Sequence, residues 1–292
     1  MLPKLEKVPS LPSSSITVKR EITPFMDYPW HYHPEFEIIL VEKSFGTRFM
    51  GSHIGRFSDG DLMFISPSLP HLWRNDGDFY QGNSDLFVDV YVIHFREDAL
   101  TKGFFNLPEL SHIKKLFLRG QQGVFIHDGI DHDRIASLIK EIVRSSDFKR
   151  LSLFLTTLDA IANTEDFDLL SSPGYTNSVN VADTERINLV MNYVMQHYME
   201  EINIREIASL VHLTEASFCR YFKAKTHKTL SQFLNEIRIL NASKLLINSN
   251  MTITEICYHT GYNNISHFNR QFKFITGMTA KEYAKKYLKE SY

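Results

Sequence analysis

The sequence is poor in cysteine and has no long apolar run, and each absence excludes a class of protein. Only two cysteines, Cys219 and Cys257, occur among 292 residues, and both lie in segments with a helical pattern. They are too few for a disulfide framework or a structural zinc finger. No stretch approaches the ~18 apolar residues that span a bilayer. Residues 1–15 lack the hydrophobic core of a secretory signal. We therefore expect a cytoplasmic protein with no membrane partner.

The chain also lacks a strong excess of charge of one sign, because its net charge is only −2. The charge is unevenly distributed, however. From Glu185 to Tyr292 there are 14 Lys and Arg against 9 Asp and Glu, while the remainder holds 18 against 25. A mildly basic C-terminal part predicts a nucleic-acid partner for that part alone. The length, and a hydrophobic share of 43%, are typical of two ordinary globular domains.

The N-terminal part has the pattern of a β-domain followed by helices. Short β-rich runs lie within residues 15–95, separated by Gly, Asp, Pro and Asn: SITVKR, FEIILVEK, GTRFMG, DLMFIS and FVDVYVIHF. Such spacing predicts a sandwich or barrel. Apolar residues then recur at helical spacing in PELSHIKKLFL, HDRIASLIKEIVRS and FKRLSLFLTTLDAIA. Residues 166–183 are rich in Ser, Asn, Gly and Pro without periodicity, which predicts a linker.

The C-terminal part repeats itself. Arg220, Phe222 and Lys223 recur as Arg270, Phe272 and Lys273 at an offset of 50, and Ile204, Glu206 and Ile207 recur at an offset of 49 as Ile253, Glu255 and Ile256. The slip of one residue falls near Asn263, where a turn would absorb it. Two copies of a helix–turn–helix unit explain this pattern. The run between them, LSQFLNEIRILNASKLLIN, predicts a long amphipathic helix that holds the two units apart.

Each second helix of the repeat has the properties of a major-groove reader. It opens on a capping residue, Thr214 or Asn264, and buries two phenylalanines four residues apart. The residues off that stripe are able to contact bases and phosphates. They are Ser217, Arg220 and Lys223 in the first copy, and Ser266, His267, Asn269, Arg270 and Lys273 in the second. A solvated helix face explains either copy alone but not two copies in phase.

Residues from about Arg186 to Tyr287 resemble the DNA-binding domain of the AraC/XylS family of bacterial transcription regulators. The resemblance rests on IREIASLVHLTEASFCRYFK, RILNASKLL and ITEICYHTGYNNISHFNRQFKFITGMTAKEYA. It implies sequence-specific binding of double-stranded promoter DNA, work with RNA polymerase, and usually activation of transcription. One departure is that the first reading helix offers the small Ala216, Ser217 and Cys219. Specificity is therefore expected to depend on the second unit and Arg220.

The stretch PWHYHPEFE places His31, His33 and Glu37 at odd positions, so a single strand would project all three from one face. With His71 and Asn75 it resembles the two cupin motifs, whose three histidines and one glutamate hold a divalent metal in cupin enzymes. The family's glycines are missing at Ser44 and near Leu69. In regulators of this family the cupin-like barrel is an effector pocket, and the helices that follow it form dimers.

These residues leave three alternatives open. His31, His33, Glu37 and His71, with Trp73 and Tyr91 as stacking walls, bind a small polar effector such as a sugar without metal; or the first four hold a divalent ion; or they form a structural hydrogen-bond network. His94, His112, His127 and His132 are taken as surface residues, because they lack partners at useful spacing.

We predict an α+β multidomain protein. A cupin-like β-barrel with flanking helices occupies residues 1–165, a linker residues 166–183, and an all-α double helix-turn-helix domain residues 184–292. The expected function is a homodimeric, effector-responsive transcription regulator that is not an enzyme and needs no cofactor, with helices in residues 131–164 as the dimer contact. The rivals are a metal-dependent cupin enzyme fused to a DNA-binding domain and a regulator that needs no effector.

Overall fold

The computed structural model describes residues 4–5, 15–26, 28–82, 85–173, 175 and 181–288. The chain divides into two compact units, one from Leu2 to Val181 and the other from Ala182 to Tyr292 together with Met1. The first unit carries the sheets and the second is helical, as the sequence predicts. Residues 174 and 176–180 of the predicted linker lie outside the described part of the chain.

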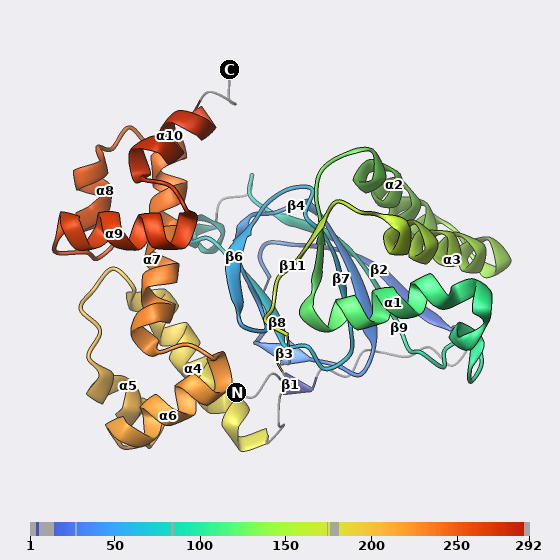
Figure 1. The fold of residues 1–292 in the computed structure, drawn as a ribbon, viewed down its shortest axis with the longest axis horizontal. Helices are drawn as coiled ribbons and strands as arrows, with labels where there is room; N and C mark the ends of the chain where they lie inside the picture. The colour runs from blue at the N-terminus through green and yellow to red at the C-terminus, as the bar shows by residue number, and fades with distance from the viewer. Residues whose placement is uncertain are drawn as a thin grey trace. The chain divides into compact units, whose positions relative to one another are not determined.

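Two sheets form the N-terminal unit (Figure 1). One has five strands in the order β1-β3-β8-β5-β6: Lys4–Leu5, His31–Tyr32, His71–Asn75, Gly46–Met50 and His53–Phe57. The other has six strands in the order β11-β10-β7-β4-β9-β2: Phe167–Leu169, Val124–Ile126, Leu62–Ile65, Phe36–Lys43, Val88–Phe95 and Ile16–Thr23. The long strands β4 and β9 are antiparallel neighbours at the centre of the larger sheet.

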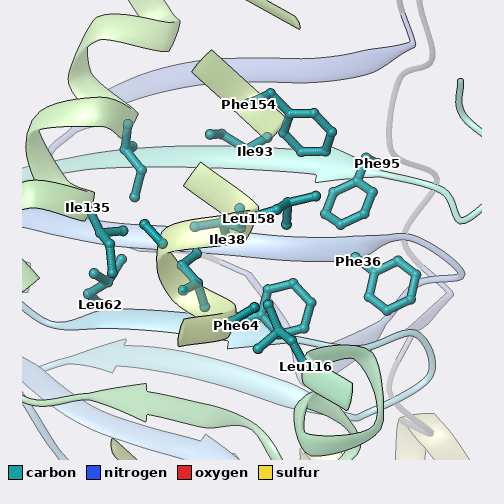
Figure 2. Packing of buried hydrophobic residues seen from close by; sticks show 14 of the residues in the cluster. Phe36, Ile38, Leu62, Phe64, Ile93, Phe95, Leu116, Ile135, Phe154 and Leu158 are labelled. Atoms are coloured by element: carbon teal, nitrogen blue, oxygen red, sulfur yellow. The ribbon is translucent and has the colours of Figure 1, made fainter. Parts of the chain in front are cut away.

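The outer face of the six-stranded sheet packs against three helices, α1 (Ser111–Arg119), α2 (Ile130–Arg144) and α3 (Asp147–Asn163). Alternate residues of the sheet face outward, among them Phe36 and Phe95. They pack with the buried stripes of the helices, including Leu116, Ile135 and Phe154, as Figure 2 shows. This alternation follows from the two-residue repeat of a strand. Among the described residues of this unit there are also four short 3₁₀ helices: Gly77–Gln81, Phe104–Asn106, Pro108–Leu110 and Gly120–Gln122.

The inner faces of the two sheets enclose a second core. It joins Ile39 and Val90 of the larger sheet to Met50, Phe57 and Trp73 of the smaller one. Strands β4 and β9 are therefore buried on both faces, so their sequences show continuous apolar runs rather than alternation. This inner core is where the candidate pocket lies.

The structure differs from the sequence prediction in two places. His31 and Glu37 do not share one strand, because His31 lies in β3 of the smaller sheet and Glu37 in β4 of the larger one. The chain bends between them, so their side chains meet by crossing from sheet to sheet. The second correction is at the predicted linker, which begins with strand β11, paired with β10 through Val124 and Leu169. Strand β11 forms because its backbone pairs with β10, and the Ser- and Asn-rich composition of the segment does not reveal this pairing.

The C-terminal unit consists of seven helices within residues 181–288: α4 (Val181–His197), α5 (Ile204–Leu210), α6 (Glu215–Thr226), α7 (Leu230–Asn248), α8 (Ile253–His259), α9 (Ile265–Thr276) and α10 (Ala280–Leu288). The repeat extends to the hydrogen bonds at the end of each reading helix. Thr226 donates to the carbonyls of Phe222 and Lys228, at 2.8 and 3.0 Å. Thr276 donates in the same way to Phe272 and Met278, at 2.7 and 3.0 Å.

Helix α7 coincides with the predicted long helix and runs between the pair α5–α6 and the pair α8–α9 (Figure 1). Its buried residues Ile239 and Ala242 pack with Phe268 and Phe272 of the second pair. Across the described residues, no helix is both long enough and apolar enough to cross a membrane.

Candidate functional site

The two predicted reading helices are α6 and α9, and each begins where the sequence predicts. Thr214 caps α6 by accepting a hydrogen bond from the amide of Ser217, and Asn264 caps α9 by accepting from Ser266 and His267. Below the caps, Phe218 and Phe222, like Phe268 and Phe272, are fully buried. Because each pair lies on one side of its helix, the opposite side must face away from the core.

Six of the eight predicted DNA contacts are exposed on that opposite side: Arg220, Lys223, Ser266, Asn269, Arg270 and Lys273. The other two are half-buried. Ser217 contacts Thr214 and Arg220 through its hydroxyl, at 3.0 and 3.4 Å. His267 packs edge-on against the ring of Tyr262. The exposed cations and amides leave each helix able to contact phosphates and base edges.

In the N-terminal unit, strand pairing gathers histidines around one carboxylate. His31 of β3 lies opposite His71 of β8, and Glu37 of β4 lies opposite His94 of β9. His33 lies in the bend between β3 and β4. All five side chains are buried. Two of the predicted surface histidines are buried, so that prediction was wrong for them. His94 reaches the site because β9 pairs with β4, and His132 lies away from it, with its Nε2 2.6 Å from the carbonyl oxygen of Gly60.

Glu37 is the centre of this cluster. One of its oxygens, Oε2, lies 2.7 Å from Nε2 of His33, 3.2 Å from Nε2 of His71 and 3.4 Å from Nε2 of His94. Burial alone would raise the pKa of Glu37. The facing His71, and the contacts with His33 and His94, outweigh burial and hold the pKa of this carboxyl well below its usual range.

The backbone fixes three of the imidazoles. Nδ1 of His31, His33 and His71 lies 2.9, 3.0 and 2.8 Å from the carbonyls of Pro29, Glu35 and Leu69. A carbonyl only accepts, so each Nδ1 must carry the proton that it donates, which leaves Nε2 as the acceptor in the neutral ring. Burial and the neighbouring His71 hold the pKa of His31 well below its usual value. Burial would also lower the pKa of His33, but the hydrogen bond and charge of Glu37 outweigh burial and raise it.

These residues fit a divalent metal ion. Ligand atoms of His31, His33, Glu37 and His71 all lie within 4.8 Å of one another, and all four residues are buried. Three Nε2 acceptors and a carboxylate are the donors that zinc, iron, nickel or manganese takes. The carbonyl behind each imidazole orients it as the outer partners of metal-binding histidines do.

Beside this cluster lies a pocket of about 530 Å³, including its open mouth. Its apolar wall includes Ile39, Val88, Val90 and Val92, and its polar lining includes Lys19, Glu21, His31, Glu37, Trp73 and His94. A site that mixes an apolar wall with a few converging polar groups is typical of small-ligand binding.

The structure places the six predicted effector residues unequally. His31, Glu37 and Trp73 line the pocket, whereas His33 and His71 contact Glu37 from outside its lining. The placement of Tyr91 was wrong. It lies on the outer face of β9, in the core that packs against the helices, because residues at odd positions of that strand point away from Val90 and Val92.

We expect the cluster to bind one divalent ion. Zinc or manganese added to protein treated with a chelator should raise the melting temperature of the full chain, because an ion bound only by the folded state at 100 times its Kd adds about 2.7 kcal/mol. His71→Ala should abolish the shift. His112→Ala should keep it, because His112 pairs with Asp159 away from the cluster. Absence of a shift with either ion, together with elemental analysis that finds no divalent metal, would contradict this expectation.

Comparison with known proteins bears on the C-terminal unit first. A family model described as a helix-turn-helix domain matches residues 207–286. The chain is 24% identical over 274 residues to the uncharacterized HTH-type transcriptional regulator YdeC of Bacillus subtilis, covering 92% of this chain and 89% of YdeC. It is 23% identical over 289 residues to the HTH-type transcriptional activator RhaS of Escherichia coli O157:H7, covering 92% of each.

Two solved structures are also similar. A regulator with an AraC-type DNA-binding domain from Chromobacterium violaceum matches 36% of this chain and 95% of its own, at 20% identity and a TM-score of 0.34. ToxT of Vibrio cholerae, bound to an unsaturated fatty acid, matches 95% of this chain and 97% of its own, at 13% identity and a TM-score of 0.34. The domain match and the similarity to YdeC and RhaS identify the class of protein. Both relatives are regulators with which the chain aligns across both of its units, and the matched domain contains both reading helices. This chain contains a helix-turn-helix domain and is a DNA-binding transcription regulator, similar along most of its length to YdeC and RhaS.

Proposed function

We propose that this regulator reads promoter DNA with α6 and α9 together, that a small polar effector in the barrel pocket controls it, and that it acts as a homodimer. The observation that carries the proposal is the pair of matched helices, each with a buried phenylalanine stripe and an exposed Arg and Lys. The similarity to the activator RhaS favours activation, and hence work with RNA polymerase in the cytoplasm.

Base reading is assigned chiefly to α9. Its exposed face offers Ser266, Asn269 and Arg270 near the N-terminal half, where a recognition helix contacts base edges. Asn suits adenine and Arg suits guanine. Helix α6 offers Arg220 for bases and Lys223 for phosphate, while its Ser217 hydroxyl is held by Thr214. The second helix-turn-helix, which contains α9, therefore contributes most of the sequence preference.

Effector binding is supported by two residues of the pocket lining that each carry a polar atom without a partner within the protein. Among the described residues, Nε1 of Trp73 and Nδ1 of His94 are buried without a hydrogen bond, and both residues line the pocket. A buried polar atom without a partner costs about 1–3 kcal/mol. The indole N–H can only donate, so the effector should present an acceptor oxygen to Trp73 and an apolar side to Val88, Val90 and Val92.

A metal-dependent enzyme would use the same His–Glu cluster, so the cluster alone does not separate the two functions. The assignment as a non-enzyme rests on the relatives, which are transcription regulators. A bound ion in a sensor would serve to orient a chelating oxygen of the effector. Turnover of a small substrate by the purified chain would favour the enzyme.

Dimerisation is assigned to α2 and α3 because both retain apolar surface beyond what the core uses. Phe148 of α3 is 81% exposed and Ile130 of α2 is 89% exposed. Within the predicted contact segment, Leu138 and Leu153 are half-buried and pack against the core between sheet and helices. Phe148 is therefore the better position for a test, since a charge there leaves the fold intact.

Changes in α9 and α6 test the DNA assignment. Arg270→Ala should cost about 1–3 kcal/mol at the cognate site and relax preference at one base pair. Lys223→Ala should weaken binding to all sequences about equally and reduce the salt dependence. Both are measured by titration of promoter DNA at several salt concentrations. Unchanged affinity and specificity in Arg270→Ala would show that α9 does not read bases.

A melting-temperature screen of the full chain against monosaccharides and hydroxy acids tests the pocket. At least one compound should raise the melting temperature, and Trp73→Phe should reduce its affinity about tenfold by removing one hydrogen bond to the ligand. The chain offers a matched control in its second tryptophan: Trp30→Phe changes another buried indole that does not line the pocket. Equal ligand shifts in both variants would place the effector elsewhere.

Sedimentation tests the dimer. Phe148→Glu should give monomers at concentrations where the parent chain is dimeric, because a buried charge opposes an apolar contact. Leu118→Glu, on the exposed side of α1, should leave the dimer unchanged. A monomeric parent, or a dimeric Phe148→Glu, would be evidence against this interface.

A further inference from the structure

Three segments of the C-terminal unit meet at one side chain, Arg238, near the middle of α7. Its Nε donates to the carbonyl of Tyr198 at 2.7 Å, and its Nη2 donates to the carbonyl of Glu200 at 2.7 Å. Both carbonyls lie in the turn between α4 and α5. On its other side, the guanidinium lies 5.5 Å from the centre of the Tyr262 ring.

Tyr262 belongs to the second helix-turn-helix, in the turn between α8 and α9. It is buried, and its hydroxyl donates to the side chain of Asn235 on α7 at 2.9 Å. Its ring contacts His267 and Phe268 at the start of α9, with centroids 5.5 and 5.4 Å apart. Arg238 is therefore one side chain away from the second reading helix.

The same two turns also touch directly. Gly261 has φ +85°, and a Cβ at this position would lie 2.7 Å from the carbonyl oxygens of Met199 and Tyr198. Only glycine allows this approach, both because of its positive φ and because no side chain fits. Helix α4, which leads into that turn, is tied to α5 of the first helix-turn-helix, because the hydroxyl of Tyr193 on α4 donates to Glu206 of α5 at 3.2 Å.

We propose that Arg238 is a positioning residue that fixes the placement of α9 relative to α6, and so sets the spacing of the two half-sites that the protein accepts. The planar guanidinium suits this role because it bonds two carbonyls at once and stacks on a ring, which a lysine cannot do. The inference rests on the proposed reading of DNA by both helices.

The physical consequence is a gain in affinity for paired half-sites, and this gain depends on the distance and angle between the two reading helices. When one reader is bound, a rigid connection presents the other at a high effective concentration, and this gain disappears if the connection does not match the spacing of the sites. Adjacent major-groove sites lie about one helical turn (~34 Å) apart. A loosened connection should therefore weaken binding to paired half-sites and tolerate altered spacing better.

The experiment uses the full chain with duplex DNA that it selects from a random-sequence pool, with the two half-sites mapped by footprinting. The variants are Arg238→Met, which keeps the apolar stem, and Arg238→Lys, which keeps the charge. The control is Glu236→Gln on the same helix, which removes an ion pair with Lys228 in the segment before α7. Affinity is measured on paired half-sites, on each half-site alone, and on paired sites with one to five inserted base pairs.

We expect Arg238→Met to bind paired half-sites at least about tenfold more weakly, as loss of effective concentration requires. Its affinity for either half-site alone should stay within about twofold of the parent chain, and inserted base pairs should cost it less than they cost the parent chain. Arg238→Lys should behave in the same direction, and Glu236→Gln like the parent.

Three results would overturn the proposal. Parental affinity and spacing preference in Arg238→Met would show that Arg238 only satisfies the α4–α5 turn. An equal loss on paired and single half-sites, with a lower melting temperature, would make Arg238 a support of the fold. If Arg238→Met does not fold, parental spacing preference in Arg238→Lys decides against the proposal. A footprint of the parent chain that covers one half-site would instead refute the double reading itself.

Discussion

A carboxylate buried among imidazoles is the constraint on which the pocket depends. An ionised carboxylate removed from water costs several kcal/mol unless charge or hydrogen bonds compensate it. Glu37 sits on a central strand of the larger sheet and is only 4% exposed, so bulk water does not solvate its charge. Its partners must come to it, and they come from both sheets: His71 from the smaller sheet and His94 from the neighbouring strand of its own. The charge of Glu37 thus links the two sheets beside the pocket, because a histidine from the smaller sheet compensates a carboxylate on the larger one.

The barrel could be predicted from sequence only in part, because its central strands are buried on both faces. In β4 and β9 an apolar residue follows an apolar residue, so alternation does not show which face is inward. Tyr91 and His94 illustrate the difficulty. The rule of alternate sides does say that they point in opposite directions, but only the pairing of Glu37 with His94 decides which one faces the pocket. That pairing joins residues 57 apart in the chain, and no local spacing reports it.

The helical unit was predictable almost to the residue, because its information is local and occurs twice. The caps Thr214 and Asn264, the buried phenylalanine pairs and the bounds of α7 all follow from spacing within a few residues. What local spacing could not predict is Arg238. Its position on α7 looks like any half-exposed cation, and its role depends on two carbonyls some forty residues earlier and a ring later in the chain. Contacts within one helix-turn-helix are encoded by nearby residues, whereas the placement of the two helix-turn-helix copies relative to each other depends on residues far apart in the sequence.

The turn around Ser68 shows how the site tolerates the loss of glycines that the cupin resemblance calls for. Ser68 has φ +65°, a conformation that costs a residue with a Cβ roughly 1–2 kcal/mol. Its amide donates to the carbonyl of His33 at 2.9 Å, and the next carbonyl, that of Leu69, accepts from Nδ1 of His71 at 2.8 Å. Ser44, at the other missing glycine, accepts from Asn75 at 2.7 Å. The turn around Ser68 thus holds the backbone of His33 and the imidazole of His71, and both of these histidines contact Glu37. A serine can therefore stand near the missing glycine, because the bonds of this turn offset the cost of its positive φ.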